Sequence, residues 1–216
     1  MTARICMDGS RPTFLRKSAI FSRFFDREFS ENDAVDYATW SARPREMISG
    51  EWTPRYLLEH WVPSLVREAA PNARFLVMLR DPVERYVSGM RQSARSKSKI
   101  KQDYACLHYL RGLYFRQLQR WLAAFPKSKF LILQYEKCVV EPEHELQRTF
   151  EFLGLPAIPA DSIPFKDRLN ITRNPKSFSL GETHRRSLVD SYRDDVRDLL
   201  RDFPEIDGAL WTNFAG

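Results

Sequence analysis

The segment Phe75–Met90, FLVMLRDPVERYVSGM, constrains the fold more than any other part of the chain. Its first five residues, Phe75–Leu79, form a continuous apolar run, which is typical of an interior parallel strand covered on both faces. Asp81 suits the N-cap of a helix and Pro82 its first helical position, while Glu84 stands three residues after the cap and predicts a closed capping box. The segment therefore predicts a buried strand that leads directly into a helix.

Arg80 stands between this predicted strand and helix, at a place that suits an anion. The N-terminus of a helix attracts negative groups such as phosphate, because its dipole is positive there and its first amides lack partners. Ser88 lies two helical turns beyond Asp81 and adds a hydroxyl donor on the same face. The pattern predicts a phosphate site, but it also occurs in α/β proteins in which the arginine only forms a surface ion pair.

The rest of the chain alternates between helix and strand patterns. Besides the opening segment, we expect a strand at Phe130–Gln134 and helices from Thr53 to about Ala70, Tyr104–Phe125, Pro142–Leu153 and Glu182–Phe203. Such alternation predicts a single α/β domain over residues 1–216, with a parallel central sheet flanked by helices. Residues 1–19 are expected to be an irregular N-terminal segment. Ligands of parallel sheets bind at the carboxyl ends of the strands, where Arg80 is placed.

Composition excludes several other classes of protein. A hydrophobic share of 43% with 29% charged residues is ordinary for a globular chain of 216 residues. No apolar run approaches the ~20 residues that span a bilayer, and the N-terminus has no apolar signal core. Three cysteines without metal-type spacing favour reduced thiols and predict neither a metal site nor disulfides. We therefore expect a cytoplasmic protein.

The chain is basic, with a net charge of +6 and a pI of about 9.3. Such a charge suits nucleic acid, an acidic membrane surface or a polyanionic small ligand. The densest basic stretch, RQSARSKSKIK, lacks the interleaved aromatic residues that stack on bases. No nucleic-acid partner is therefore expected.

The string R-D-P-x-x-R-x-x-S, formed here by Arg80, Asp81, Pro82, Arg85 and Ser88, resembles a signature of the sulfotransferases. These enzymes use the sulfate donor 3′-phosphoadenosine 5′-phosphosulfate (PAPS) and release adenosine 3′,5′-bisphosphate. The resemblance implies that Arg80 and Ser88 hold the 3′-phosphate of the cofactor. It also implies the P-loop-NTPase-like fold of this family.

Further segments resemble carbohydrate, heparan-type and bacterial sulfotransferases in the correct order, over roughly residues 20 to 212. They are FFDREF, GEWTPRYL, the stretch FPKSKFLILQYEKCVVEPEHELQRTFEFLGLP and the closing stretch from ETHRR to DGALW. The basic segment RLNITRNPKS lies where the family has a loop that folds over the cofactor. Arg173 and Lys176 in this segment are therefore further candidates for cofactor binding.

Two family features are altered. The family's first strand leads into a loop resembling G-x-x-[KR]-[SC]-G-T-T that binds the 5′-phosphosulfate. This chain has no G-T-T, so neither that loop nor the first strand is evident. The early candidate for the loop is Arg4–Phe14, RICMDGSRPTF. In the family segment K-E-x-H-F-F-D the glutamate is a general base. Phe21 stands in its place and Arg23 replaces the histidine, whereas Asp26 keeps its type and is the candidate catalytic base.

These patterns predict a sulfotransferase that moves a sulfuryl group from PAPS to a hydroxyl or amine of a small-molecule, glycan or lipid acceptor. A catalytically degenerate sulfotransferase-like module that only binds the nucleotide is the alternative. A basic nucleic-acid-binding protein is a third possibility. The sequence does not distinguish among the acceptors, because acceptor choice resides in variable loops.

Overall fold

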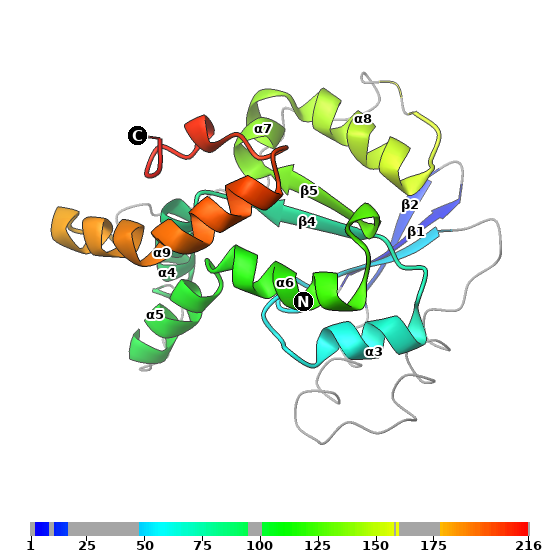
Figure 1. Cartoon of the computed structure of the whole chain (residues 1–216). Coiled ribbons are helices and arrows are strands. Elements are labelled where there is room, and N and C mark those ends of the chain that lie inside the picture. The colour runs from blue at the N-terminus through cyan, green and yellow to red at the C-terminus, as the bar shows by residue number, and fades with distance from the viewer. Residues whose placement is uncertain are drawn as a thin grey trace. The chain divides into compact units, whose positions relative to one another are not determined.

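The computed structural model describes residues 3–8, 11–16, 48–94, 101–157, 159 and 178–215 (Figure 1). The contacts of the chain divide it into two compact units, and each is described by itself. The first unit comprises Met1–Ala73 together with Ala123–Phe125. The second comprises Arg74–Leu122 together with Pro126–Gly216 and contains the predicted phosphate site.

The first unit begins with an antiparallel hairpin. Strands β1 (Ala3–Asp8) and β2 (Arg11–Arg16) pair along their whole length, with Asp8 opposite Arg11 across a two-residue connection. The prediction that residues 1–19 are irregular is therefore wrong for both strands. The early candidate for a phosphosulfate loop falls in this hairpin, where a second strand follows the first in place of a helix.

The remaining elements of the first unit are one strand and one helix. Strand β3 (Ile48–Trp52) pairs antiparallel with the other edge of β1, and helix α3 (Val62–Ala69) has Pro63 in its first turn. The helix expected from Thr53 to about Ala70 begins only at Val62, with Pro63 in its first turn. The Thr53 hydroxyl donates to Glu51 rather than capping a helix, and the chain makes turns up to residue 58. Proline at a helix start fits the local preference, since the amide it lacks has no intrahelical partner there.

The second unit contains a parallel two-stranded sheet, as the sequence predicts. Strand β4 (Phe75–Leu79) pairs in parallel with β5 (Phe130–Gln134), and the ladder ends where Leu79 faces Gln134. Leu79 is buried, but Leu76 and Met78 on alternate positions are 43% and 56% exposed. The expectation that β4 is covered on both faces is therefore wrong: in the described structure only one of its faces is packed.

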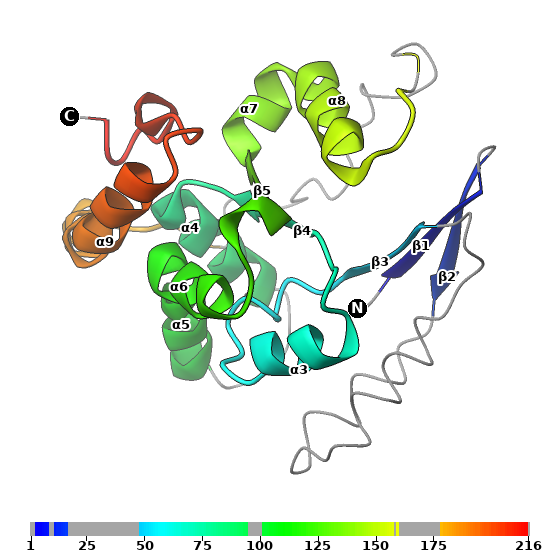
Figure 2. The ribbon, with the colours of Figure 1, turned by 45° about the vertical axis from the view of Figure 1, so that its right-hand side comes forward.

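The described part of the second unit also contains six helices and two short 3-10 turns. They are α4 (Pro82–Ser93), α5 (Lys101–Leu110), α6 (Tyr114–Ala124), η1 (Lys127–Lys129), α7 (Tyr135–Val140), α8 (Pro142–Leu153), α9 (Glu182–Asp202) and η4 (Gly208–Leu210). Figures 1 and 2 show α7 continuing directly from β5, and α9 lying beside α4. The strand–helix alternation places the start of α4 at the carboxyl end of β4.

The single helix expected over Tyr104–Phe125 is divided into α5 and α6. A Cβ atom added at Gly112 would lie 2.6 Å from the hydroxyl of Tyr192, so the turn between the two helices passes directly against α9. Asp195 of α9 then caps α6, because its carboxylate accepts hydrogen bonds from the amides of Phe115 and Arg116. A cap supplied from 79 residues further along the chain leaves no local sequence signal.

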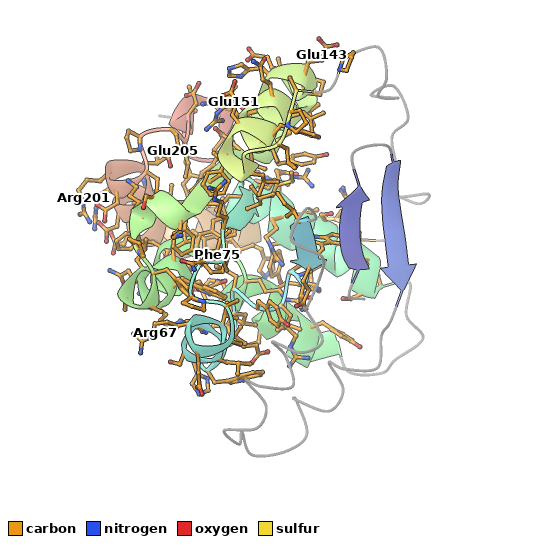
Figure 3. The ribbon with its side chains drawn as sticks, turned by 90° about the vertical axis from the view of Figure 1, so that its right-hand side faces the viewer. Arg67, Phe75, Glu143, Glu151, Arg201 and Glu205 are labelled. Carbon is orange, nitrogen blue, oxygen red and sulfur yellow. The ribbon has the colours of Figure 1, made fainter. Side chains whose placement is uncertain are left out.

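Aromatic side chains form the core under the packed face of β4. Phe75 stacks on Phe130 with ring centroids 4.8 Å apart and meets Trp121 edge-on at 5.0 Å. Figure 3 shows Phe75 within the mass of side chains, whereas Glu143 of α8 and Arg201 of α9 lie at the surface. Burial of these large rings contributes to the stability of the second unit.

Candidate functional site

The candidate site lies at the carboxyl end of β4. Arg80 directly follows the strand and is partly buried. Its guanidinium lies over the ring of Tyr135, 4.7 Å from the ring centroid, which is a cation–π contact. In the described residues Arg80 forms no ion pair with a carboxylate. A cation that is held on an aromatic ring and forms no ion pair there is suited to receive an anion.

The start of α4 follows the predicted N-cap. The Asp81 carboxylate accepts hydrogen bonds from the amides of Val83 (2.9 Å) and Glu84 (3.2 Å), and Pro82 occupies the first turn. The predicted capping box is wrong in its second half, because the amide of Asp81 donates to Glu136 at 3.0 Å rather than to Glu84. The first amides of α4 are thus already bonded within the protein. An anion at this place would therefore be bound by side chains. The helix would contribute only the electrostatic field of its dipole, not hydrogen bonds from its first amides.

Glu84 takes part in a polar network at the same helix end. It accepts a hydrogen bond from Arg185 at 2.7 Å, and Arg185 also donates to the side chain of Asn213 at 2.8 Å. Burial opposes ionisation of Glu84, but its bonds to Arg185 and Asn213 and the positive charge of Arg80 lower its pKa below the ordinary value. Glu84 therefore forms a direct ion pair with Arg185, whereas Arg80 acts on Glu84 only electrostatically and forms no ion pair in the described structure.

Ser88 lies on α4, one turn beyond Glu84 and on the same partly buried face. No hydrogen bond of its hydroxyl is formed within the described structure. Arg80 and Ser88 are therefore brought onto one strand–helix unit as the sequence predicts, each with its donor group available. Arg85, the other arginine of the signature, has a structural contact instead. It donates to the carbonyl of His108 at 3.2 Å, and burial lowers its pKa.

A second layer of side chains, which sequence reasoning did not identify as functional, surrounds the Arg80–Asp81 junction. The hydroxyl of Tyr114 donates to the Arg80 carbonyl at 2.9 Å, and burial is the main cause of the raised pKa of this hydroxyl. The second carboxylate oxygen of Glu136 accepts from the indole of Trp211 at 3.1 Å. The Asp81 carboxylate accepts from the amide and side chain of Asn213. In the sequence, Glu136 lies within the stretch FPKSKFLILQYEKCVVEPEHELQRTFEFLGLP, whose resemblance indicates the family but assigns the residue no role.

The other predicted site residues, Asp26, Arg173 and Lys176, lie outside the described residues. The structure does, however, describe Phe178, two positions after Lys176. Its carbonyl accepts from Arg91 of α4 at 3.1 Å, and its ring meets Tyr86 of α4 edge-on at 6.4 Å. The chain that leaves the basic segment is thus anchored on the helix that carries Ser88.

Neither a metal centre nor a membrane span is found in the described ranges. No three histidine, cysteine, aspartate or glutamate side chains there lie close enough to hold a metal ion. Among the described helices, none has both the length and the apolar character needed to cross a bilayer.

Comparison with known proteins identifies the family of the chain. Residues 17–188 match the family described as "Sulfotransferase domain". The chain belongs to the sulfotransferase domain family. A solved bacterial sulfotransferase, from Alicyclobacillus acidocaldarius, superposes on 73% of this chain and 65% of its own with a TM-score of 0.56 at 21% identity. That likeness confirms the predicted α/β sulfotransferase fold with a parallel sheet.

The curated relatives of this sulfotransferase domain include animal enzymes of heparan sulfate. It is 30% identical to mouse heparan sulfate glucosamine 3-O-sulfotransferase 3A1 over 64% of the chain and 39% of the relative. It is also 30% identical to human heparan sulfate glucosamine 3-O-sulfotransferase 6, over 64% of the chain and 44% of the relative. The chain thus spans less than half the length of the curated relatives it matches.

Proposed function

We propose that this protein binds PAPS and catalyses transfer of its sulfuryl group to a hydroxyl or amine acceptor. The observation that carries the proposal is the guanidinium of Arg80, which stands at the carboxyl end of a parallel strand without a carboxylate partner in the described structure. Membership of the sulfotransferase domain family supports the chemistry. PAPS would supply the activated sulfuryl group.

The side chains at the site fit one half of this cofactor, the 3′-phosphate. Arg80 supplies a planar, permanently charged donor, and Ser88 supplies a neutral hydroxyl donor on the neighbouring helix. The basic residues Arg173 and Lys176 would add positive charge from the segment that ends at the anchored Phe178. Asp26 would remove the acceptor's proton. The roles of Arg173, Lys176 and Asp26 rest on the family resemblance.

Arg80→Ala tests the proposal most directly. A hydrogen bond to a charged group is worth about 1.5–3 kcal/mol, so affinity for adenosine 3′,5′-bisphosphate should fall about tenfold or more. Ser88→Ala, which removes a neutral hydroxyl worth about 1 kcal/mol, should cost about fivefold. Isothermal titration calorimetry measures both. Arg74→Ala is the matched control, because Arg74 precedes β4 at its opposite end and donates to the Phe152 carbonyl. Equal affinities of wild type and Arg80→Ala would refute the assignment.

A nucleotide-binding module without catalysis is the second candidate, and a specific observation favours it. The early segment that resembled a phosphosulfate loop forms the β1–β2 hairpin, and the sequence has no G-T-T. A transfer assay with radiolabelled PAPS separates the two candidates. The relatives' names make glycans with free amines and hydroxyls the first acceptors to offer, followed by lipids and small alcohols. Binding of the bisphosphate without labelled product from any acceptor would favour the module.

A further inference from the structure

The peptide unit that joins Arg80 to Asp81 has both of its polar groups bonded to side chains. Its carbonyl accepts from the Tyr114 hydroxyl at 2.9 Å, and its amide donates to Glu136 at 3.0 Å. Tyr114 comes from the start of α6 and Glu136 from the first turn of α7, so two different elements meet at a single peptide.

This peptide lies just beyond the β4–β5 ladder, whose last pair is Leu79 with Gln134. Beyond that pair no strand partner fixes the chain, and the peptide could rotate about the bonds on either side of it. Tyr114 and Glu136 replace the missing ladder bonds. The bond from the carboxylate is charge-assisted, and two bonds at opposite ends of one amide polarise it in the same direction.

The guanidinium of Arg80 is supported as well. Its contact with the Tyr135 ring comes from the residue directly before Glu136. The adjacent pair Tyr135 and Glu136 thus restrains both the side chain and the backbone of Arg80. Glu136 is itself fixed by the indole of Trp211, a side chain with no exposed surface.

We infer that Tyr114, Tyr135 and Glu136 are positioning residues that hold Arg80 in the orientation needed to bind the 3′-phosphate of the cofactor. The inference rests on the proposed function. Holding this peptide fixes ψ of Arg80, and the rotamers open to a side chain depend on its backbone φ and ψ. A donor that is already oriented loses less freedom when an anion binds. These residues therefore act on affinity for one phosphate group without touching it.

The test compares two nucleotides that differ only in this phosphate. The affinity ratio of adenosine 3′,5′-bisphosphate to adenosine 5′-monophosphate, measured by calorimetry, isolates the 3′-phosphate contribution. Tyr114→Phe removes one hydroxyl and should lower this ratio about fivefold, the equivalent of one hydrogen bond. Tyr192→Phe is the matched control. Tyr192 is equally buried and its hydroxyl also donates to a backbone carbonyl at 2.9 Å, but that carbonyl belongs to Tyr109.

The two tyrosine variants separate positioning from stability. Both should lower the unfolding temperature, because each variant loses one hydrogen bond from a buried tyrosine hydroxyl to a backbone carbonyl. Only Tyr114→Phe should change the affinity ratio. If the two variants keep the same ratio as the wild type, the inference is overturned.

A second pair of variants avoids any risk to folding. Tyr135 is 39% exposed, so its replacement disturbs little packing. Tyr135→Leu removes the ring under the guanidinium and should lower the ratio, whereas Tyr135→Phe keeps the ring and should preserve it. An unchanged ratio in Tyr135→Leu contradicts the role of that ring. If the wild type itself binds both nucleotides equally, the proposed 3′-phosphate site fails, and the inference fails with it.

Discussion

At the scale of single residues, the site depends on which polar groups are already paired. Arg185 and Arg85 are both bonded within the protein, whereas Arg80 rests only on an aromatic ring among the described residues. Three arginines that look equivalent in the sequence thus have different roles. The sequence predicts Arg80 and Ser88 as site residues, because a strand end and a helix start are local signals. It could not identify Tyr114 or Glu136, which reach the site only after the chain has folded.

His108 is a buried histidine that makes the stability of the folded protein depend on pH. Its side chain is 4% exposed, its Nε2 lies 2.9 Å from the Ser93 hydroxyl, and its Nδ1 has no hydrogen-bond partner in the described structure. Burial, aided by the positive charges of Arg85 and Arg111, lowers its pKa from 6.5 to about 4. The folded protein therefore resists a proton that the unfolded chain accepts.

The free energy of unfolding should consequently fall as the pH drops from about 6.5 to about 4. In this window the unfolded state binds more protons, and the slope due to His108 is at most about 1.4 kcal/mol per pH unit. Urea unfolding at several pH values, compared between wild type and His108→Gln, measures it. The same substitution at the exposed His144 serves as control. If His108→Gln keeps the full pH dependence of the wild type, the assignment is wrong.

At the scale of elements, the packing of α4 on α5 depends on a glycine, Gly89, which has no side chain. A Cβ atom added at Gly89 would lie 2.3 Å from Nδ1 of His108, so glycine permits the close approach of the two helices. Alanine normally stabilises a helix interior by about 0.5–1 kcal/mol relative to glycine. At position 89 the steric overlap reverses this effect, so alanine destabilises the protein relative to glycine.

Gly89→Ala should therefore destabilise the protein by about 1–3 kcal/mol, the usual cost of an overpacked contact. Chemical denaturation gives the value. In a His108→Ala background the clash is absent, and the same change should become neutral or stabilising. A destabilisation of equal size in both backgrounds would show that the cost has another origin.

Elements were predictable from the sequence where their signals are local. Pro82 and Asp81 start α4 as expected, and α8 ends at Gly154, whose φ of 71° is the left-handed conformation that glycine adopts freely. Predictions failed where a partner arrives from far along the chain. The amide of Asp81 goes to Glu136, and the break between α5 and α6 is fixed by Asp195 and Tyr192 of α9.

At the scale of the molecule, the C-terminal segment is joined to the middle of the chain. Trp211 has no exposed surface and bonds Glu136, while Asn213 bonds the Asp81 carboxylate across 132 positions of sequence. Gln134 at the end of β5 exchanges two further hydrogen bonds with the backbone of Asp207. The segment after α9 thus completes the second unit.

Trp211→Ala should destabilise the second unit by about 3–5 kcal/mol, because it removes a buried indole and leaves a cavity. Trp211→Phe, which keeps most of the apolar volume but loses the bond to Glu136, should cost less. Trp52→Ala is the matched control, since Trp52 is 61% exposed and its loss should change stability little. Thermal unfolding followed by circular dichroism measures all three. Equal effects at the two tryptophans would contradict this account of the C-terminal segment.

The bond between Asn213 and Asp81 has a consequence for biosynthesis. The strand and helix that carry Arg80 leave the ribosome long before Asn213 and Trp211 are translated. Until then, Glu136 lacks its indole donor and Asp81 lacks two of its bonds, so the proposed phosphate site at the end of β4 is incomplete. Contacts between residues this distant form late and slow the folding of a chain. Nascent chains arrested before residues 211–213 emerge from the ribosome should therefore not retain adenosine 3′,5′-bisphosphate, and binding should appear once this segment has emerged.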